Sequence, residues 1–281
     1  MRNWILIFLS VIIFGFISCD NDSPNDRDNS PIANVDIDSY NPMFSENNFL
    51  DFYLVGNIKL YFNNNKLTRR VGGFTSPSSG SGMPSYLNDK IYDTIFQNEN
   101  KITIHKKIIP SEGIISIVPN KKTFLIDNQG KFIYKINYNQ EYSENDNDTI
   151  YFEYSGSKII KTYSKNYLNF IDKESLFYYN VNQNLDSIVN KFYVYDSEKD
   201  EMILSPTKEK EIFEDYDNTN NPFKTLIIFD DMFKRSLSKN NYRKHTIRVY
   251  DTNYQNSYYT KYTKNITPTY DSQGNLIYKL N

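Results

Sequence analysis

Residues 124–136 have the sequence Phe-Leu-Ile-Asp-Asn-Gln-Gly-Lys-Phe-Ile-Tyr-Lys-Ile, which has the features of two strands joined by a tight turn. Asp127 can bind the backbone of a tight turn, and Gly130 stands where such a turn requires a positive φ. After the turn, a period of two predicts one apolar row on one face of a strand. The residues of that row are Phe132, Tyr134, Ile136 and Tyr138. The stretch therefore predicts a β-hairpin.

The hairpin pattern recurs along the chain. Residues 269–280 repeat it, because both copies contain Asp-x-Gln-Gly-x-[Phe/Leu]-Ile-Tyr-Lys-[Ile/Leu]. Weaker copies with Asn, Gly or Asp turns occur at 60–67, 150–160, 177–185 and 191–203. A single hairpin is marginal in water and must bury its apolar row against neighbours. The sequence therefore predicts an all-β fold over 47–281, an antiparallel meander of repeated hairpins that forms a curved sheet or partial barrel.

One segment breaks the strand pattern. Apolar residues between Phe223 and Leu237 approximate helical spacing, and Pro222 suits the first turn of a helix. We expect one short helix near 223–238, packed on the open face or end of the sheet.

The N-terminal residues have the features of an export signal. Arg2 precedes an apolar run from Trp4 to Ser18, and Cys19, the only cysteine, follows it. A basic start, an apolar stretch of about 7–15 residues and a small-residue cleavage site describe a signal peptide. A transmembrane anchor needs roughly 20 apolar residues, more than this run offers. We predict a signal peptide at 1–18, lipidation of Cys19 and a disordered tether at 19–46, with an unlipidated cleaved signal as the alternative.

Two resemblances extend this prediction. The short signal, the Ser-Cys junction and the acidic leader with Asp20 and Asp22 resemble Bacteroidetes lipoproteins. The segment from Asp217 through Asn221, Pro222 and Phe223, followed by 237–241, is similar to a Bacteroidetes lipoprotein family built of repeated β-hairpins. These resemblances imply delivery to the outer membrane, on the cell surface or otherwise on the periplasmic side. They imply no reaction.

Composition narrows the partners. The net charge of −2 gives no basis for nucleic acid binding. Tyr and Phe number 25 and 19, which favours strands. Many tyrosines are also compatible with carbohydrate stacking. However, Asn, Lys and Ile are enriched together with Tyr and Phe, which indicates a codon bias rather than a binding face.

No catalytic motif stands out. His105 and His245 are too few and too far apart for a zinc site or a triad, and we expect both to be solvated strand residues. We predict no metal and no cofactor. The Asp-Ser/Thr-aliphatic pattern resembles Bacteroidetes O-glycosylation acceptors, and it makes candidates of Thr94, Thr149 and Ser187.

The expected function is therefore a membrane-anchored, exported lipoprotein with a non-enzymatic binding role, whose partner is a glycan or a surface protein. The alternatives are a carrier of lipid or another hydrophobic ligand, with the 223–237 segment as a lid, and a glycan-active hydrolase. Glycan binding predicts a row of exposed aromatic side chains, a carrier predicts a hollow lined with Phe, Leu and Ile, and an enzyme predicts a cleft with carboxyl groups of raised pKa.

Overall fold

The computed structural model describes residues 34–37, 56–63, 66–71, 74–77, 84–87, 91–108, 121–138, 147–166, 168–219, 221–251, 257–265, 269–270 and 276–277. The predicted signal peptide and Cys19 lie outside these ranges. Within them, no helix combines the length and the apolar character that crossing a membrane would need.

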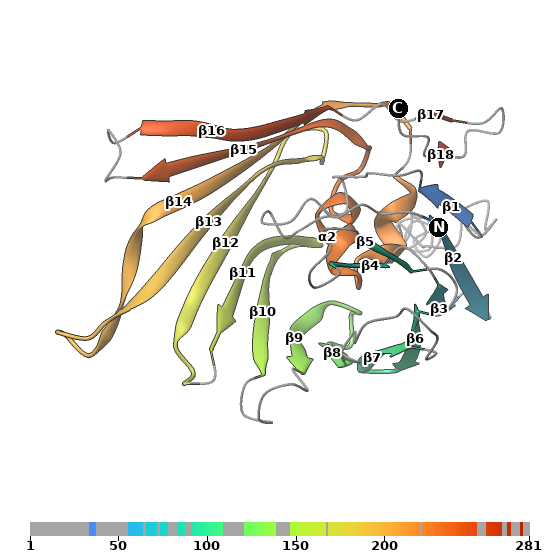
Figure 1. Cartoon of the computed structure of the whole chain (residues 1–281), viewed down its shortest axis with the longest axis horizontal. Coiled ribbons are helices and arrows are strands. Elements are labelled where there is room, and N and C mark those ends of the chain that lie inside the picture. The colour runs from blue at the N-terminus through green and yellow to red at the C-terminus, as the bar shows by residue number, and fades with distance from the viewer. Residues whose placement is uncertain are drawn as a thin grey trace, which may run out of the picture. The chain divides into compact units, whose positions relative to one another are not determined.

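The main sheet has fourteen strands, and every neighbouring pair is antiparallel (Figure 1). Across the sheet the strands follow chain order, so the predicted meander is confirmed. They are β1 (Asn34–Ile37), β2 (Gly56–Asn63), β3 (Lys66–Val71), β6 (Ile91–Asn98), β7 (Lys101–Ile108), β8 (Lys121–Ile126), β9 (Phe132–Tyr138), β10 (Asp148–Ser155), β11 (Lys158–Lys165), β12 (Ile171–Tyr179), β13 (Leu185–Asp196), β14 (Glu201–Tyr216), β15 (Tyr242–Asp251) and β16 (Ser257–Asn265). The order starts at β1 and ends at β16, so the sheet is open.

Two small sheets accompany it. Strand β4 (Phe74–Pro77) pairs with β5 (Pro84–Leu87), and β17 (Thr269–Tyr270) pairs with β18 (Leu276–Ile277). The second copy of the hairpin repeat thus forms a separate pair of two-residue strands rather than part of the main sheet. Strand β1 lies within the residues predicted as a tether, so the sheet starts before residue 47. The rest of 19–46 lies outside the described ranges.

Three turns have the same hydrogen-bond pattern and the same backbone conformation. In each, an Asp or Asn side-chain oxygen accepts hydrogen bonds from the backbone N–H groups two and four residues later, at 2.8–3.1 Å. The residue three positions after it has a positive φ, a conformation that favours Gly and tolerates Asn. The pairs are Asp127 with Gly130 (φ 78°), Asn166 with Asn169 (φ 65°) and Asn180 with Gln183 (φ 65°).

Strict alternation fails in β9. The pairing of β8 with β9 shifts between Leu125 and Ile126, where a residue of β9 is skipped. The buried residues of the strand are Phe132 and Lys135, three positions apart, at 7% and 8% exposure. Tyr134 instead faces Tyr151 of β10, with ring centroids 6.0 Å apart. The predicted apolar row is therefore wrong at Phe132, which the irregularity places on the inner face with Lys135, whereas Tyr134, Ile136 and Tyr138 share the outer face as predicted.

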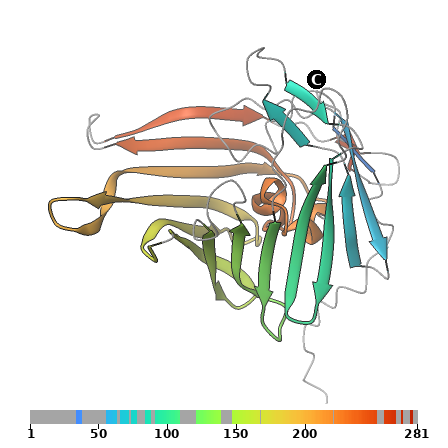
Figure 2. The same cartoon turned by 60° about the horizontal axis from the view of Figure 1, so that its bottom comes forward.

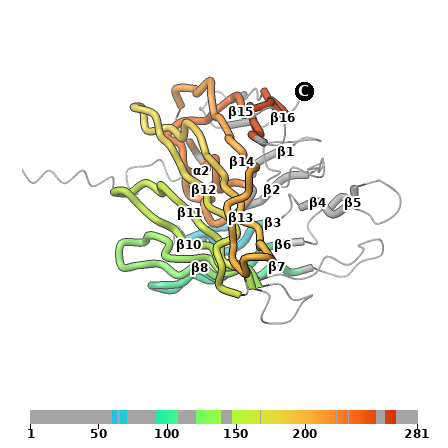
Figure 3. Tube along the Cα trace, turned by 90° about the vertical axis from the view of Figure 1, so that its left-hand side faces the viewer, coloured from blue at the N-terminus to red at the C-terminus, as the bar shows by residue number. Residues whose placement is uncertain are grey.

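The expected helix is present as two short pieces, η2 (Pro222–Leu226) and α2 (Asp230–Ser236), here called the helical segment. One core cluster joins its Phe223, Leu226 and Met232, each 0% exposed, to β2, β3 and β6–β9. A second cluster draws on β11–β15, and Phe233 and Leu237 pack against it. Both halves of the sheet thus pack on one segment, which lies in the curve of the sheet (Figure 2). Figure 3 shows the sheet from another side, with β8, β10, β11 and β12 following one another toward β15.

Candidate binding pocket between the sheet and the helical segment

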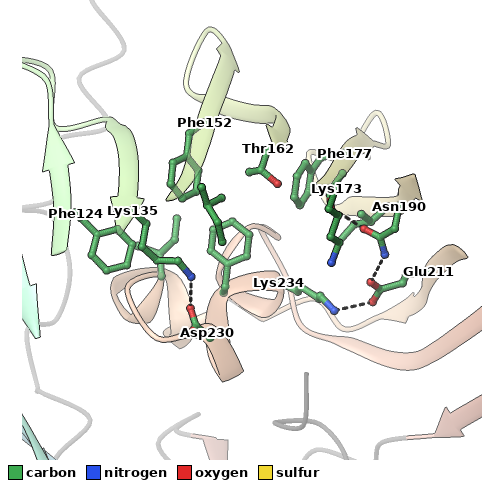
Figure 4. A pocket seen from close by; sticks show the side chains of 15 residues that line it. Phe124, Lys135, Phe152, Thr162, Lys173, Phe177, Asn190, Glu211, Asp230 and Lys234 are labelled. Carbon is green, nitrogen blue, oxygen red and sulfur yellow. Dashed lines mark hydrogen bonds and ion pairs between the residues drawn. The ribbon is translucent and has the colours of Figure 1, made fainter. Parts of the chain in front are cut away.

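A pocket of about 120 Å³ lies between the inner face of the sheet and the helical segment (Figure 4). Its walls are mainly aromatic and aliphatic, with polar groups spaced among them. The apolar wall residues are Phe124, Ile150, Phe152, Phe177, Ile188, Ile227 and Phe233. The carrier alternative predicts a hollow lined with Phe, Leu and Ile, whereas this pocket is lined with Phe and Ile and also with charged side chains.

Helix α2 places three side chains toward the pocket. Asp230, Phe233 and Lys234 are spaced i, i+3 and i+4, which puts them on one face of a helix. The Phe233 ring meets the edges of Phe152 and Phe177, with centroids 6.2 and 6.1 Å apart. Phe233 thus lies between an acidic and a basic neighbour, which contact different strands on the inner face of the sheet.

The acidic neighbour, Asp230, binds two lysines of the sheet. Its Oδ1 accepts a hydrogen bond from Lys135 Nζ at 2.6 Å, and its Oδ2 accepts one from Lys122 Nζ. Lys135 lies on β9 and Lys122 on β8. These contacts hold the start of α2 to the centre of the sheet.

The basic neighbour, Lys234, binds Glu211 of β14. Glu211 Oε2 accepts from Lys234 Nζ at 2.9 Å and lies 3.0 Å from His245 Nε2. Its Oε1 accepts from Asn190 Nδ2 at 3.0 Å, and Asn190 Oδ1 in turn accepts from Ser175 Oγ at 2.7 Å. Since Glu211 is 3% exposed, these partners replace the water that burial removes.

Burial and charge act in opposite directions on the pKa of Glu211. Burial raises the pKa of this carboxyl group, but the Lys234 ammonium and the hydrogen bonds from His245 and Lys234 outweigh it and hold the pKa below 4.5. Burial lowers the pKa of His245 from 6.5, and Glu211 only partly opposes this. At neutral pH, His245 is therefore neutral and donates from Nε2. The prediction of a solvated His245 is wrong, because its ring stacks on the ring of Phe213 on the inner face of the sheet, with centroids 4.8 Å apart.

We expect stability to fall in two steps as the pH drops. Since the folded pKa of His245 is lowered from 6.5, the unfolded chain binds the proton first, and stability falls below about pH 6.5. Since the pKa of Glu211 lies below 4.5, its contribution is complete above that pH and is lost below it. Urea unfolding between pH 8 and about pH 2 measures both steps. His245→Gln, which keeps a donor, should reduce the first step to the part that comes from His105, whose pKa burial and the neighbouring lysines also lower. A wild-type curve that is flat from pH 7 to 5 would contradict this prediction.

The two ends of the helical segment are joined by hydrogen bonds of the Asn221 side chain. Its Oδ1 accepts from the backbone N–H of Phe223 at 2.9 Å, as helix-capping residues do. Its Nδ2 donates to the carbonyl oxygens of Arg235 and Ser238 at 2.6 and 2.9 Å. One buried amide therefore joins the start of η2 to the end of α2 and fixes the wall of the pocket.

The outer face carries a row of tyrosines. Tyr134, Tyr151 and Tyr163 lie opposite one another on β9, β10 and β11, and the rings of Tyr151 and Tyr163 stack at 5.0 Å with an interplanar angle of 12°. The ammonium groups of Lys165 and Lys161 lie 5.5 and 5.2 Å from the centroids of Tyr151 and Tyr163. The ring faces are thus covered by each other and by lysines.

The predicted modification sites differ in accessibility. Thr94 on β6 and Thr149 on β10 are partly exposed, whereas Ser187 on β13 is 3% exposed. In the folded protein the Ser187 hydroxyl is therefore shielded from a modifying enzyme. Cys19 lies outside the described residues, and its lipidation stays a prediction. Within the part of the chain that the structure describes, no group of three or more His, Cys, Asp or Glu side chains is placed to hold a metal ion.

The pocket residues were not predicted as a site. Lys135, Lys173, Glu211 and Asp230 lie far apart in the sequence and converge through the curvature of the sheet. The only signal was the unusual 223–237 segment, which indicated a cover on the sheet but not the charges beneath it.

No family model matches the chain, and no curated protein matches it. A porin-like protein from Bacteroides uniformis is 11% identical, with a TM-score of 0.48 over 78% of this chain and 80% of that one. Another from Bacteroides vulgatus is 12% identical, with a TM-score of 0.42 over 79% and 84%. A protein of unknown function from Bacteroides fragilis is 10% identical, with a TM-score of 0.20 over 68% and 90%. Similarity at this level gives no ground for assigning an activity.

Proposed function

We propose that this chain is an exported, lipid-anchored binding protein that holds a small amphiphilic molecule between the inner face of the sheet and the helical segment. The observation that carries the proposal is the pocket itself, whose aromatic walls lie beside polar groups. Binding sites for small molecules combine such apolar walls with a few oriented polar groups.

The size of the pocket limits the ligand. An apolar cavity of about 150 Å³ takes up benzene, so the 120 Å³ present here suit one ring or a short aliphatic chain. A full-length acyl chain exceeds that space. The proposed ligand is therefore smaller than the lipid of the carrier alternative.

The outer face supports glycan binding less well than the pocket supports a small ligand. Stacking on a sugar requires a free aromatic face, and the faces of Tyr151 and Tyr163 are turned to each other and to lysines. The tyrosine row instead gives the sheet cross-strand aromatic pairs, which stabilise antiparallel strands.

The electrostatics of the pocket favour binding over acid catalysis. A glycosidase needs one carboxylic acid of raised pKa beside a second carboxylate. In this pocket Asp230 and Glu211 are each bonded to a lysine, and the pKa of Glu211 is lowered. Both groups act as fixed counter-ions for α2 in the proposed binding role.

A pocket-filling variant tests the proposal. Thr162 lines the pocket from β11 and is 9% exposed, and Thr162→Phe would place a ring in the open space. We expect phenylacetate or 2-phenylethanol to bind the wild type in calorimetric titrations and to lose binding in Thr162→Phe. Tyr134→Ala, on the outer face, is the control and should bind as the wild type does. Absence of binding by both probes, or equal binding in a folded Thr162→Phe variant, would contradict the proposal.

A further inference from the structure

The pocket has a surplus of positive charge. Three lysines line it, Lys135, Lys173 and Lys234, against the two carboxylates Asp230 and Glu211. Lys135 is paired with Asp230 at 2.6 Å, and Lys234 with Glu211 at 2.9 Å. Both carboxylates are thus already bonded to other lysines, and His245 adds no negative charge.

Lys173 is the surplus cation. Among the described residues, Lys173 has no ion-pair or hydrogen-bond partner for its side chain, and its ammonium lies 5.8 Å from the ring centroid of Phe192. The residue is exposed, although it lines the pocket, so it stands at the mouth. Figure 4 shows its side chain reaching from β12 into the space between the sheet and the helical segment. A lysine ammonium offers three donors and needs acceptors.

A hydroxyl group lies beside this cation. Thr162 pairs with Ser175, and Ser164 pairs with Lys173, so Thr162 and Lys173 are diagonal neighbours on the same face of adjacent strands. Diagonal neighbours lie about 7–8 Å apart, a span that one small oxyanion can bridge through long side chains. The Thr162 hydroxyl points into the pocket (Figure 4). Within the described part of the chain, its side chain makes no hydrogen bond to another residue.

From this arrangement we infer that the ligand is an organic monoanion with an apolar body about the size of one ring. The inference rests on the proposed function and names the chemistry of its ligand. The carboxylate accepts hydrogen bonds from the Lys173 ammonium and the Thr162 hydroxyl at the mouth. The apolar body lies deeper, between Phe152 and Phe177, which are both part of the pocket wall.

Among the residues that the structure describes, Lys173 is the one lysine of the pocket lining without a carboxylate partner, so it can match one added negative charge. A carboxylate brought next to Lys173 is neutralised, whereas the second charge of a phosphate dianion would lie there without a further unpaired cation, because Lys122 and Lys135 are both bonded to Asp230 and Lys234 is bonded to Glu211. An unpaired charge near a desolvated surface is strongly disfavoured. We therefore expect a carboxylate to bind better than a phosphate monoester of the same body.

Calorimetric titration of the full mature protein tests the inference with phenylacetate, 2-phenylethanol and phenyl phosphate. Phenylacetate is expected to bind at least about tenfold more tightly than the alcohol, the factor that one hydrogen bond to a charged group provides. Lys173→Met keeps the apolar stem and removes the charge, so it should reduce phenylacetate affinity to that of the alcohol and leave the alcohol unchanged. Lys208→Met, on the outer face beside Tyr250, makes the same change in net charge and should have no effect.

The outcomes separate the two proposals. Equal affinity for phenylacetate and the alcohol, or no effect of Lys173→Met, overturns the inference that the ligand is a monoanion. The proposal that the pocket binds a small molecule then still stands. Tighter binding of phenyl phosphate also overturns it. Absence of binding by all three compounds overturns both the inference and the proposed function.

Discussion

Glu211→Ala is expected to lower the free energy of unfolding by about 3 kcal/mol. The substitution removes the shared acceptor of Lys234, His245 and Asn190. Breaking a buried ion pair costs about 3–5 kcal/mol, because one charge stays buried without its partner. We expect the lower value of this range, because the Lys234 side chain is 25% exposed and can turn partly toward water.

The matched control is Glu214→Ala on the same strand. Glu214 pairs with Lys244 at 2.8 Å, but their side chains are 47% and 41% exposed. Exposed pairs of this kind contribute about 0–1 kcal/mol. Urea unfolding at pH 7 measures both variants. If Glu211→Ala cost no more than Glu214→Ala, the buried network would not hold α2 to the sheet, and the pocket would lack the fixed wall described above.

Cys19→Ser is expected to release the protein from the membrane completely. Acyl chains are held by about 0.8 kcal/mol per buried methylene, and two or more chains anchor a protein stably. Because Cys19 is the only cysteine, no other thiol can take the lipid. In a Bacteroidetes host, we expect the wild type to sediment with membranes and to incorporate an alkyne-labelled palmitate. The variant should do neither.

Asp20→Ala serves as the control for that experiment, because it alters the acidic leader but keeps the thiol. It should remain labelled. A wild-type protein that carries no label, or a Cys19→Ser variant that stays with the membranes after a carbonate wash, would contradict the lipid anchor. Either result would leave the pocket proposal unaffected, because the residues that line the pocket lie between Phe124 and Lys234.

The strands and their turns could be predicted because local chemistry sets them. Asp127 and Gly130 specify their turn through one side-chain oxygen and one positive φ, and the structure has both. The turn at Asn166 uses the same arrangement, but its Asn169 replaces the glycine that makes the pattern easy to recognise. A search for Asp or Asn followed three residues later by Gly or Asn would have found it.

The inner face could not be predicted, because it depends on register and curvature. Strict alternation predicts that Phe132 and Lys135, three positions apart, lie on opposite faces of β9. Because one residue of β9 is skipped in the pairing, both lie on the inner face. Glu211 lies on a sixteen-residue strand with many charged residues, and nothing in that stretch distinguishes it from Glu209 or Glu214. Its importance arises from Lys234 and His245, which the fold brings to it from other elements.

The position of a bound ligand tests the proposed pocket directly. A crystal of the mature protein soaked in 4-bromophenylacetate, with data collected at the bromine absorption edge, locates the halogen by anomalous scattering. We expect one peak among Phe152, Phe177 and Phe233, with the carboxylate toward Lys173. A crystal with no peak in this pocket, or with bromine bound only on the outer tyrosine row, would contradict this expectation.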